Sequence, residues 1–546
     1  MKNASKSNLF IFTICLGSLT LMILDSLQLL VFMDELSFLR SLSGFVKNKS
    51  IIPMYTRYPS LYTYIISIPV YAAYSIFYFI KGFPVDGLKD LILLKFIFSE
   101  NLILWARASR FITMIFSAAT TLLILKEANK KYGFVALLIA ASMLTLYPFG
   151  AYLDLSRYGL PDMPMTFFVT LSMLLCFSYI DKRQIKYLYW ASFISGLAMS
   201  TKFNAIMMFF PLSITPLLCG KKEQPLYKYY VKIILLVIFG FFLGSPAFLI
   251  SLKSYIAGFS AEADILFKSS HIGAHGTNWI WLLDLLWSET PIISSLIILS
   301  IIYCAFKRTK EDILFLALLV PSFLIMGALQ KKSIWYFVFL YPLISLYAGR
   351  LMKDILERIK TPYLNKLLCT VLVVVFTIPA WHLYKRLSKT ILPNNRVVAK
   401  NWIHENIPSK ASIIVDWAFT PELYDEKYIG ERIREIESSG SKFSKMIKEH
   451  YLKNPVYDTT SLKDLDYNVN NLTNVNAKYL IISSGCYEKF FPSKKRLLPK
   501  ENHPTYKEFM KRREFYSSLF NNRTPFRPVE VFSSGSGFII KIYERI

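Results

Sequence analysis

Long apolar runs alternate with short polar segments over the first 383 residues of the chain. A helix needs about 20 mostly apolar residues to cross the ~30 Å hydrocarbon core of a bilayer. Eleven runs reach or approach that length, at 8–30, 106–125, 133–149, 163–180, 188–201, 203–219, 233–250, 291–306, 312–329, 334–349 and 367–383. The pattern predicts a polytopic α-helical membrane protein whose transmembrane domain covers residues 1–383.

Basic residues predict which ends of these runs stay in the cytoplasm, because short cytoplasmic loops carry an excess of Lys and Arg. Lys2 and Lys6 place the N-terminus inside and residue 34 outside. Later basic clusters also end inward runs, at 182–183, 221–232, 307–310 and 350–358. Residues 31–105 and 251–290 are then external loops. We expect a multi-pass protein of the plasma (inner) membrane.

The apolar run at 61–80 has two interpretations. If it crossed the membrane alone, the basic cluster at 126–131 would fall outside, against the charge rule. The following segment, 90–100, is amphipathic, which is typical of helices that lie in the membrane surface. We therefore predict that 61–80 lies in the interfacial layer, although its length would also permit a crossing.

From residue 384 the chain changes character. Residues 401–408 read as a helix that stops at a proline, and 412–416, 479–483 and 537–543 read as strands, with Lys- and Glu-rich helices between them. These signals predict a soluble α/β domain at 384–546. The number of preceding crossings places this domain on the extracytoplasmic side.

Composition agrees with this topology and narrows the function. Of the 546 residues, 54% are hydrophobic, which excludes a soluble globular protein, and the net charge is +26. In a polytopic protein this charge indicates cytoplasmic loops and anionic lipid, not a nucleic-acid partner. The chain has no glycine-rich nucleotide-binding motif, and its six cysteines show no disulfide or metal pattern.

Two adjacent carboxylates, Asp34 and Glu35, follow the first apolar run. Charged residues at the mouth of a membrane helix are costly and often functional. Neighbouring residues on a helix point to different faces, so the two acids cannot serve the same contact. One of them could accept a reacting proton while the other holds structure or a metal. A solvated pair that marks the end of a span is the alternative.

The surroundings of this pair carry a family resemblance. An interfacial helix is predicted at 37–49, and Arg57-Tyr58-Pro-Ser-Leu follows it. An acidic pair, an interfacial helix and an aromatic-Pro-x-Leu element resemble the first external loop of GT-C glycosyltransferases. The branch concerned holds protein O-mannosyltransferases and lipid A aminoarabinose transferases. The resemblance implies that the first acid, Asp34, is catalytic, and that Arg57 and Tyr58 bind substrate.

Three further strings resemble elements of the same branch. Arg110, in Ala-Arg-Ala-Ser-Arg-Phe, occupies the place of an arginine that faces the donor phosphate. In Arg-Tyr-Gly-Leu-Pro-Asp, Arg157 matches a substrate-binding arginine and Asp162 matches a second acidic position. The alternative is that Asp162 only caps the next helix. Lys202, in Gly-Leu-Ala-Met-Ser-Thr-Lys, would contact phosphate, with a structural ion pair as the alternative.

Lys331 and Lys332 lie in a predicted outer turn, where the charge rule disfavours lysine. With Trp335 and Tyr336 after them, they resemble a late element of the branch whose basic residue is associated with the polyprenyl phosphate. Snorkelling to ordinary headgroups is the alternative for these lysines. We therefore assign Lys331, Lys332 and Tyr336 to donor phosphate binding.

His271 and His275 lie in the external loop at 251–290 with helical spacing. Two histidines are half of a metal site, and Gly273 and Gly276 disfavour a firm helix. A bound divalent cation is therefore one interpretation of the two histidines, and contact with the acceptor substrate or a plain loop is the other. No other cofactor is predicted.

Together these observations predict an enzyme that transfers one sugar from a polyprenyl-phosphate donor to an acceptor hydroxyl outside the membrane. The transfer would invert the anomeric centre, with Asp34 as the base and with Glu35 and Asp162 also in the catalytic set. The acceptor could be a glycan, a lipid or a protein. A transporter or flippase of lipid-linked glycans is the alternative, but it should show paired repeats with helices broken at the midplane. A glycan polymerase or ligase would lack the Asp-Glu loop.

Overall fold

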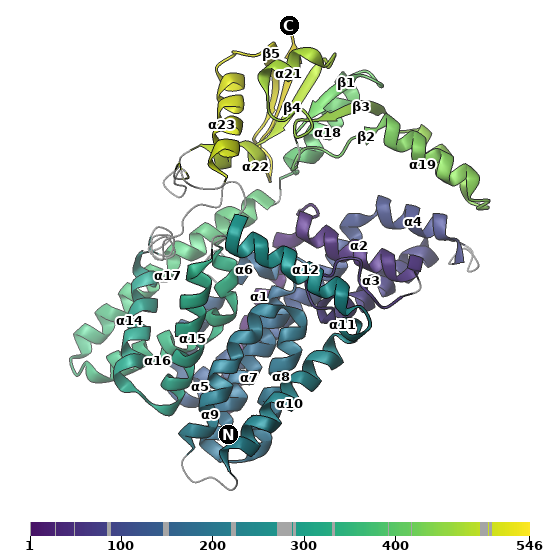
Figure 1. Ribbon diagram of the computed structural model, residues 1–546. Helices are drawn as coiled ribbons and strands as arrows, with labels where there is room; N and C mark the ends of the chain where they lie inside the picture. The colour runs from purple at the N-terminus through teal and green to yellow at the C-terminus, as the bar shows by residue number, and fades with distance from the viewer. Residues whose placement is uncertain are drawn as a thin grey trace.

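The protein consists of a helical bundle and a mixed α/β domain beyond one of its ends (Figure 1). The computed structural model describes residues 2–27, 29–48, 50–83, 89–145, 152–219, 225–269, 287, 291–329, 333–390, 392–416, 418–491, 499, 501 and 505–546.

The bundle is built from helices α1 to α17, whose apolar sequences were expected to span a membrane or to lie along it. Their bounds are α1 Lys2–Leu27, α2 Met33–Asn48, α3 Leu61–Ile80, α4 Leu91–Glu100, α5 Leu102–Thr145, α6 Tyr152–Ser156, α7 Asp162–Lys182, α8 Ile185–Thr201, η2 Phe203–Met208, α9 Phe209–Leu218, α10 Leu226–Gly244, α11 Pro246–Ile250, α12 Leu252–Asp264, η3 Ile265–Ser269, α14 Pro291–Lys307, α15 Lys310–Ala328, η4 Ile334–Leu340, α16 Tyr341–Arg358 and α17 Pro362–Thr390.

Many of these helices are suited to a bilayer by length and composition. Within the described residues, seven segments qualify as candidate spans, at Ser7–Leu27, Leu61–Ile80, Leu102–Thr145, Asp162–Lys182, Leu226–Gly244, Lys310–Ala328 and Ile334–Arg358. Two shorter apolar segments, Phe203–Leu218 and Ser294–Lys307, add to them. The chain is therefore a multi-pass α-helical membrane protein, as predicted.

Helix α5 contains two of the predicted crossings, joined at Gly133. Gly133 has φ +82° and ψ −172°, a left-handed conformation that a residue with a Cβ rarely adopts. The chain turns back here. The Phe134 ring lies 5.5 Å from Phe10 near the start of α1, whereas Arg107 donates to the Leu27 carbonyl at the end of α1. The first half of α5 thus runs antiparallel to α1.

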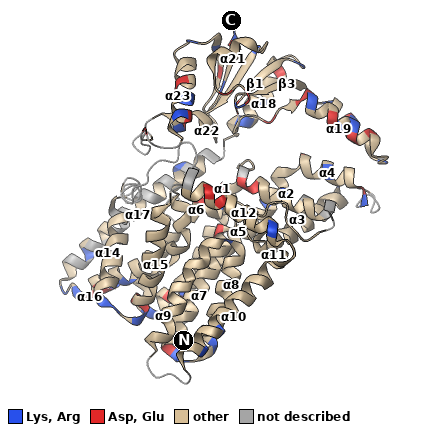
Figure 2. Ribbon diagram, in the orientation of Figure 1, with Lys and Arg blue, Asp and Glu red and all other residues tan. Residues whose placement is uncertain are grey.

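The bundle has two chemically different ends. One end, which holds the N-terminus, carries an ion cluster in which Lys131 contacts Glu127, Asp181 and Glu311. Figure 2 shows basic side chains gathered at this end, around α9 and α16. The other end, which we call the site end, holds the start of α2, the loop before α7 and the end of α8. This separation agrees with the charge pattern in the sequence.

Helix α3 stays at the site end, although it is long and apolar enough to cross. Ser60, just before it, bonds to Ser245 and Tyr255 of the α11–α12 region, at 2.9 and 2.5 Å. Phe83, just after it, packs against Phe443 of the C-terminal domain at 6.4 Å. Both ends of α3 therefore lie on the same side, which favours the interfacial prediction.

Helices α8 and α10 cross closely because glycines face each other. A Cβ on Gly196 would lie 2.2 Å from the Val237 carbonyl oxygen, and one on Gly240 would lie 2.2 Å from the Phe193 carbonyl oxygen. Small residues allow backbones in membrane bundles to approach in this way. The crossing fixes the end of α8, where Lys202 follows.

The C-terminal domain has one six-stranded sheet with the order β2-β3-β1-β4-β6-β5. Strands β1, β2, β3 and β4 pair in parallel, whereas β6 pairs antiparallel to β4 and β5. The elements are α18 Asn395–Asn406, β1 Ser412–Val415, β2 Tyr424–Asp425, α19 Glu426–Ser438, α20 Ser444–Leu452, β3 Val456–Ser461, α21 Val469–Asn474, β4 Tyr479–Ser483, α22 Ser484–Tyr487, η5 Glu488–Phe490, α23 Tyr506–Phe520, β5 Phe526–Phe532 and β6 Ile540–Arg545.

The domain contacts the bundle through α4. Glu100 accepts a hydrogen bond from the Tyr424 hydroxyl at 2.8 Å and lies 3.1 Å from His450 Nε2. The Phe96 ring packs edge-on against Tyr451. The soluble domain therefore rests on the interfacial helices at the site end.

Candidate active site

Glu35 lies at the centre of the site end and is fully buried. Its carboxylate forms a bidentate pair with Arg110, in which both N···O distances are 2.7 Å. The backbone N–H groups of Phe32 and Gly159 donate to the same carboxylate at 2.8 and 2.6 Å. A carboxylate has about four acceptor positions, so all of them are used.

Arg110 is equally saturated. Besides Glu35, its guanidinium donates to the carbonyl oxygens of Ser26, Leu29 and Leu30, at 3.4, 2.8 and 2.8 Å. These five bonds use all five of its N–H donors, and its side chain is fully buried. No donor is left for a phosphate.

The buried pair bears on two sequence predictions. In this structure Glu35 and Arg110 are buried and bond to each other and to backbone groups, and the catalytic role of Glu35 and phosphate binding by Arg110 stay predictions. The pair ties the end of α1, the start of α2, α5 and the loop before α7 together. We call these two residues the Glu35–Arg110 clamp.

Asp34 points elsewhere, as expected for the neighbour of Glu35 on a helix. It lies in the first turn of α2 and is exposed. Burial raises the pKa of the Tyr58 phenol well above its ordinary value, and the charges of Glu262, Asp162 and Asp34 raise it further. Three carboxylates from α2, α7 and α12 thus act on one tyrosine in the loop before α3. Asp34 and Asp162 therefore both lie near Tyr58.

Lys202 completes this group. Its Nζ lies 2.6 Å from Asp162 Oδ1, and both side chains are largely buried. The same ammonium lies 5.7 Å from the centre of the Tyr58 ring and 6.0 Å from that of Tyr336. The structure therefore brings together Asp162, Lys202, Tyr58 and Tyr336 from four separate segments.

An ammonium carries three N–H donors, and Asp162 uses one of them. Among the described residues, the Lys202 ammonium therefore keeps donor capacity beside two aromatic rings, unlike Arg110. The structural ion pair that was the alternative role for Lys202 is also present, because its ammonium contacts Asp162.

Helix α12 closes one side of this group. A Cβ on Gly258 would lie 2.6 Å from the Thr56 carbonyl oxygen, so the helix packs directly on the loop that holds Arg57 and Tyr58. Glu262, one turn further along α12, lies 3.9 Å from Arg57. Arg57 is partly exposed and faces the site from its rim.

Arg157 is engaged with two acids. Its guanidinium lies 3.1 Å from Asp25 of α1 and 3.1 Å from Asp154 of α6, and it is mostly buried. Next to it, the rings of Phe32, Tyr158 and Trp335 pack together, with centroids 5.0 to 6.5 Å apart. Arg157 therefore holds α1 and α6 at the edge of the site, and its role toward a substrate stays a prediction.

Four predicted site residues, Lys331, Lys332, His271 and His275, lie outside the described residues. Within the part that the structure describes, no group of three or more His, Cys, Asp or Glu side chains is placed to hold a metal ion.

Two acids of the site end were not singled out in the sequence. Asp25 lies within the first apolar run and is buried. An acid is costly there without a partner, and this cost is the sequence signal that could have identified it. Glu262 stands in the external loop at 251–290, where the spacing of the two histidines is the stronger sequence signal. Only the packing of α12 on the loop at 56–58 shows that it belongs to the site.

Comparisons with known proteins agree with this architecture. Residues 104–250 match the family model described as dolichyl-phosphate-mannose-protein mannosyltransferase. That segment contains Arg110, Arg157, Asp162 and Lys202. Comparison of the sequence with curated proteins finds no match.

Solved structures resemble the chain over nearly its whole length. The ArnT structure from Cupriavidus metallidurans bound to undecaprenyl phosphate has a TM-score of 0.51 at 10% identity, covering 98% of this chain and 97% of ArnT. The apo form of that ArnT has a TM-score of 0.49 at 11% identity, with coverage of 98% and 97%. The archaeal oligosaccharyltransferase AglB from Archaeoglobus fulgidus has a TM-score of 0.46 at 13% identity, with coverage of 97% and 74%.

The match to ArnT shows the fold of both parts of the chain, and the family match covers the helices that carry Asp162 and Lys202. The chain thus has the fold of ArnT, and its segment 104–250 is similar to the protein mannosyltransferase family.

Proposed function

We propose that this protein transfers one sugar from a polyprenyl-phosphate donor to an acceptor hydroxyl at the outer surface of the plasma membrane. The observation that carries the proposal is the convergence of Asp34, Asp162 and Lys202 around Tyr58 at one end of the bundle. A carboxylate and a cation at the membrane surface are what this reaction needs, because its donor is already activated by phosphate.

In the proposed reaction, Asp34 accepts the proton of the acceptor hydroxyl. The hydroxyl oxygen attacks the anomeric carbon from the side opposite the phosphate. The bond between that carbon and the phosphate oxygen breaks, and its electron pair leaves with the polyprenyl phosphate. One displacement inverts the anomeric centre.

Lys202 is the proposed partner of the leaving phosphate. Its ammonium keeps donor capacity after pairing with Asp162, and the Tyr58 and Tyr336 rings hold it in place. This assignment takes over the role first expected of Arg110, whose donors are all used by the clamp. Lys331 and Lys332 remain proposed as further cations for the phosphate.

The proposal can be tested before the sugar and the acceptor are known. Cells that lack the protein should accumulate one polyprenyl-phosphate sugar, detectable by mass spectrometry of extracted lipids. Wild-type protein should remove this lipid. Asp34→Asn should fail to do so, because loss of a general base costs about 10²- to 10⁴-fold in rate.

Asp264→Asn, which changes an exposed acid on α12, is the matched control and should restore the wild-type lipid profile. Normal removal of the lipid by Asp34→Asn, at equal protein levels, would exclude Asp34 as the base. Absence of any accumulated lipid-linked sugar in the deletion cells would count against the donor class itself.

A further inference from the structure

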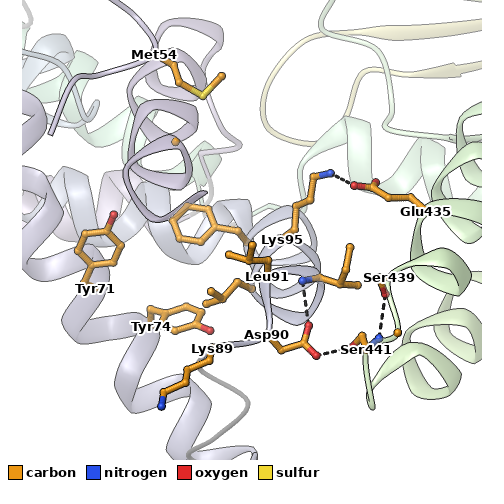
Figure 3. Close-up of a pocket in the computed structure, with 15 residues that line it drawn as sticks. Met54, Tyr71, Tyr74, Lys89, Asp90, Leu91, Lys95, Glu435, Ser439 and Ser441 are labelled. Atoms are coloured by element: carbon orange, nitrogen blue, oxygen red, sulfur yellow. Dashed lines mark hydrogen bonds and ion pairs between the residues drawn. The ribbon is translucent and has the colours of Figure 1, made fainter. Parts of the chain in front are cut away.

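Carboxylates that are wholly or partly buried at the site end have hydrogen-bond donors beside them. Asp90, just before α4, accepts from two backbone N–H groups of α4 and from the Ser441 hydroxyl of the C-terminal domain (Figure 3). Donors also lie within 3.1 Å of four further acids, which are Asp25, Glu35, Glu100 and Asp162. Such donors offset the cost of taking a charged group out of water.

Glu262 of α12 differs from these acids. Its side chain is only 18% exposed, and its one ion pair among the described residues is with Arg57, at 3.9 Å. That separation is too long for a hydrogen bond. Within the same part of the chain, no hydrogen bond reaches this carboxylate. Glu262 therefore holds a largely buried charge whose acceptor positions are open.

The position of Glu262 follows from the face of α12 that carries it. The Tyr255 hydroxyl bonds to Ser60, and a Cβ on Gly258 would lie 2.6 Å from the Thr56 carbonyl oxygen. Tyr255, Gly258 and Glu262 follow one another at spacings of three and four residues, so they share one face of the helix. Because this face packs on the loop before α3, the Glu262 carboxylate is held at that loop.

Tyr58 of that loop connects Glu262 to the proposed phosphate partner. Burial raises the pKa of the Tyr58 phenol, and among the carboxylates that raise it further Glu262 comes before Asp162 and Asp34. The same ring lies 5.7 Å from the Lys202 ammonium. An open carboxylate and a cation with free donors therefore stand beside one tyrosine.

The charges of the site limit which sugar fits there. Asp162 is balanced by its pair with Lys202. Asp34 and Glu262 carry two further negative charges, and Arg57 at the rim balances one of them. A donor phosphate adds more negative charge, so the site as a whole repels an acidic sugar. Sugar hydroxyls, in contrast, can donate to an open carboxylate in charge-assisted hydrogen bonds.

We propose that Glu262 binds the transferred sugar by accepting hydrogen bonds from its hydroxyl groups, and that this sugar carries no acidic group. The donor would lie with its phosphate at Lys202 and its sugar ring beside Tyr58, next to the Glu262 carboxylate. This inference rests on the proposed function, because it takes the sugar to arrive on a polyprenyl phosphate.

The test compares two lipids by thermal-shift titration of the purified full-length protein. The probes are undecaprenyl phosphate and the polyprenyl-phosphate sugar purified from cells that lack the protein. Glu262→Gln keeps the shape of the side chain and removes its charge. It should bind undecaprenyl phosphate within about twofold of wild type, but the sugar-bearing lipid at least about tenfold more weakly, because hydrogen bonds to a charged group are lost. Lys202→Met should weaken the binding of both lipids.

Asp264→Asn, which changes an exposed acid of the same helix, is the matched control and should bind both lipids like wild type. Unchanged binding of both lipids by Glu262→Gln would overturn the role of Glu262, and so would an equal loss for both. A carboxylate in the accumulated sugar, seen by mass spectrometry, would overturn the predicted sugar class. Wild-type protein that binds neither lipid would overturn the transfer reaction itself.

A double variant separates sugar binding from the ion pair with Arg57. If Glu262 acted only by holding Arg57, its replacement would have no effect once Arg57→Gln is present. We expect Glu262→Gln to weaken binding of the sugar-bearing lipid by a similar factor in both backgrounds, because the two side chains would contact different groups. No further loss in the double variant would assign Glu262 to the ion pair and overturn the proposal.

Discussion

Adjacent side chains with opposite environments define the site at the scale of single residues. Asp34 is exposed, whereas Glu35 is buried and accepts four hydrogen bonds. The helix geometry that separates them was readable from the sequence. Which acid is structural was not, because the partners of Glu35 are backbone groups and an arginine brought in by the fold.

Removal of half of the Glu35–Arg110 clamp should destabilise the protein. Glu35→Ala leaves the Arg110 charge buried without its partner, which typically costs 3–5 kcal/mol. Thermal unfolding of the purified protein in detergent should show a large fall in melting temperature, with no comparable fall for Asp34→Asn. A Glu35→Ala protein as stable as wild type would contradict the clamp.

Neutralising Lys202 should weaken binding of the donor phosphate. Lys202→Met removes the cation but strands the buried Asp162 carboxylate, so the double variant Lys202→Met/Asp162→Asn is needed beside it. Both should bind undecaprenyl phosphate at least tenfold more weakly in a thermal-shift titration, a loss of about 1.4 kcal/mol or more.

Arg107→Ala is the control for this measurement. Arg107 is exposed at the same end of the bundle and donates to the Leu27 carbonyl. Its replacement should leave the affinity for undecaprenyl phosphate within about twofold. Equal binding by wild type and both Lys202 variants would remove Lys202 from the donor site.

At the scale of elements, the sequence predicted long helices and two strands well. Strands β1 and β4 lie where 412–416 and 479–483 were expected, and α3 has the contacts of an interfacial helix. Three strands were not predicted. Strand β2 has two residues, β3 is mostly polar, and β5 contains Pro528 at an edge with an irregular register, so none shows the usual alternation.

The close crossing of α8 and α10 gives a prediction at this scale. Gly240→Ala places a Cβ 2.2 Å from the Phe193 carbonyl oxygen, which forces the two helices apart. We expect a loss of stability of about 1–3 kcal/mol. The measurement is thermal unfolding of the purified variant.

Gly17→Ala is the matched substitution, because nothing lies within 4 Å of a Cβ at that position in α1. Alanine favours a helix, so this variant should be as stable as wild type or slightly more so. If both alanine variants unfold at the wild-type temperature, the two helices do not cross as closely as described.

At the scale of the whole molecule, charge placement predicted which loops share a side. The contacts of Asp162 with Lys202, and of Lys131 with Asp181 and Glu311, group the loops into the two ends that were expected. The sequence could not place α12 on the loop at 56–58, since that contact depends on Gly258 and on the backbone of a distant segment.

Orientation in the membrane gives the prediction at this scale. Single cysteines at 81, 253 and 463, in a background without the native cysteines, should react with an impermeant thiol reagent in intact cells. Cysteines at 130, 186 and 308 should react only after permeabilisation. All six positions are exposed in the structure.

Each outcome of the labelling has a distinct meaning. Reaction at 253 and 463, without reaction at 81, would show that α3 crosses the membrane. The reverse pattern at all six positions would place the candidate active site in the cytoplasm and exclude the proposed outer-surface reaction.

The Glu35–Arg110 clamp also has a consequence for the order of assembly during synthesis. Glu35 meets Arg110 only after 75 further residues have been made, and the N–H of Gly159 only after 124. At 5–20 residues per second, the second interval lasts roughly 6–25 s. Until these partners have been made, the unfilled acceptor positions of the Glu35 carboxylate need water at the membrane surface. The helices on both sides of it therefore cannot reach their final packing until the loop before α7 has emerged from the ribosome.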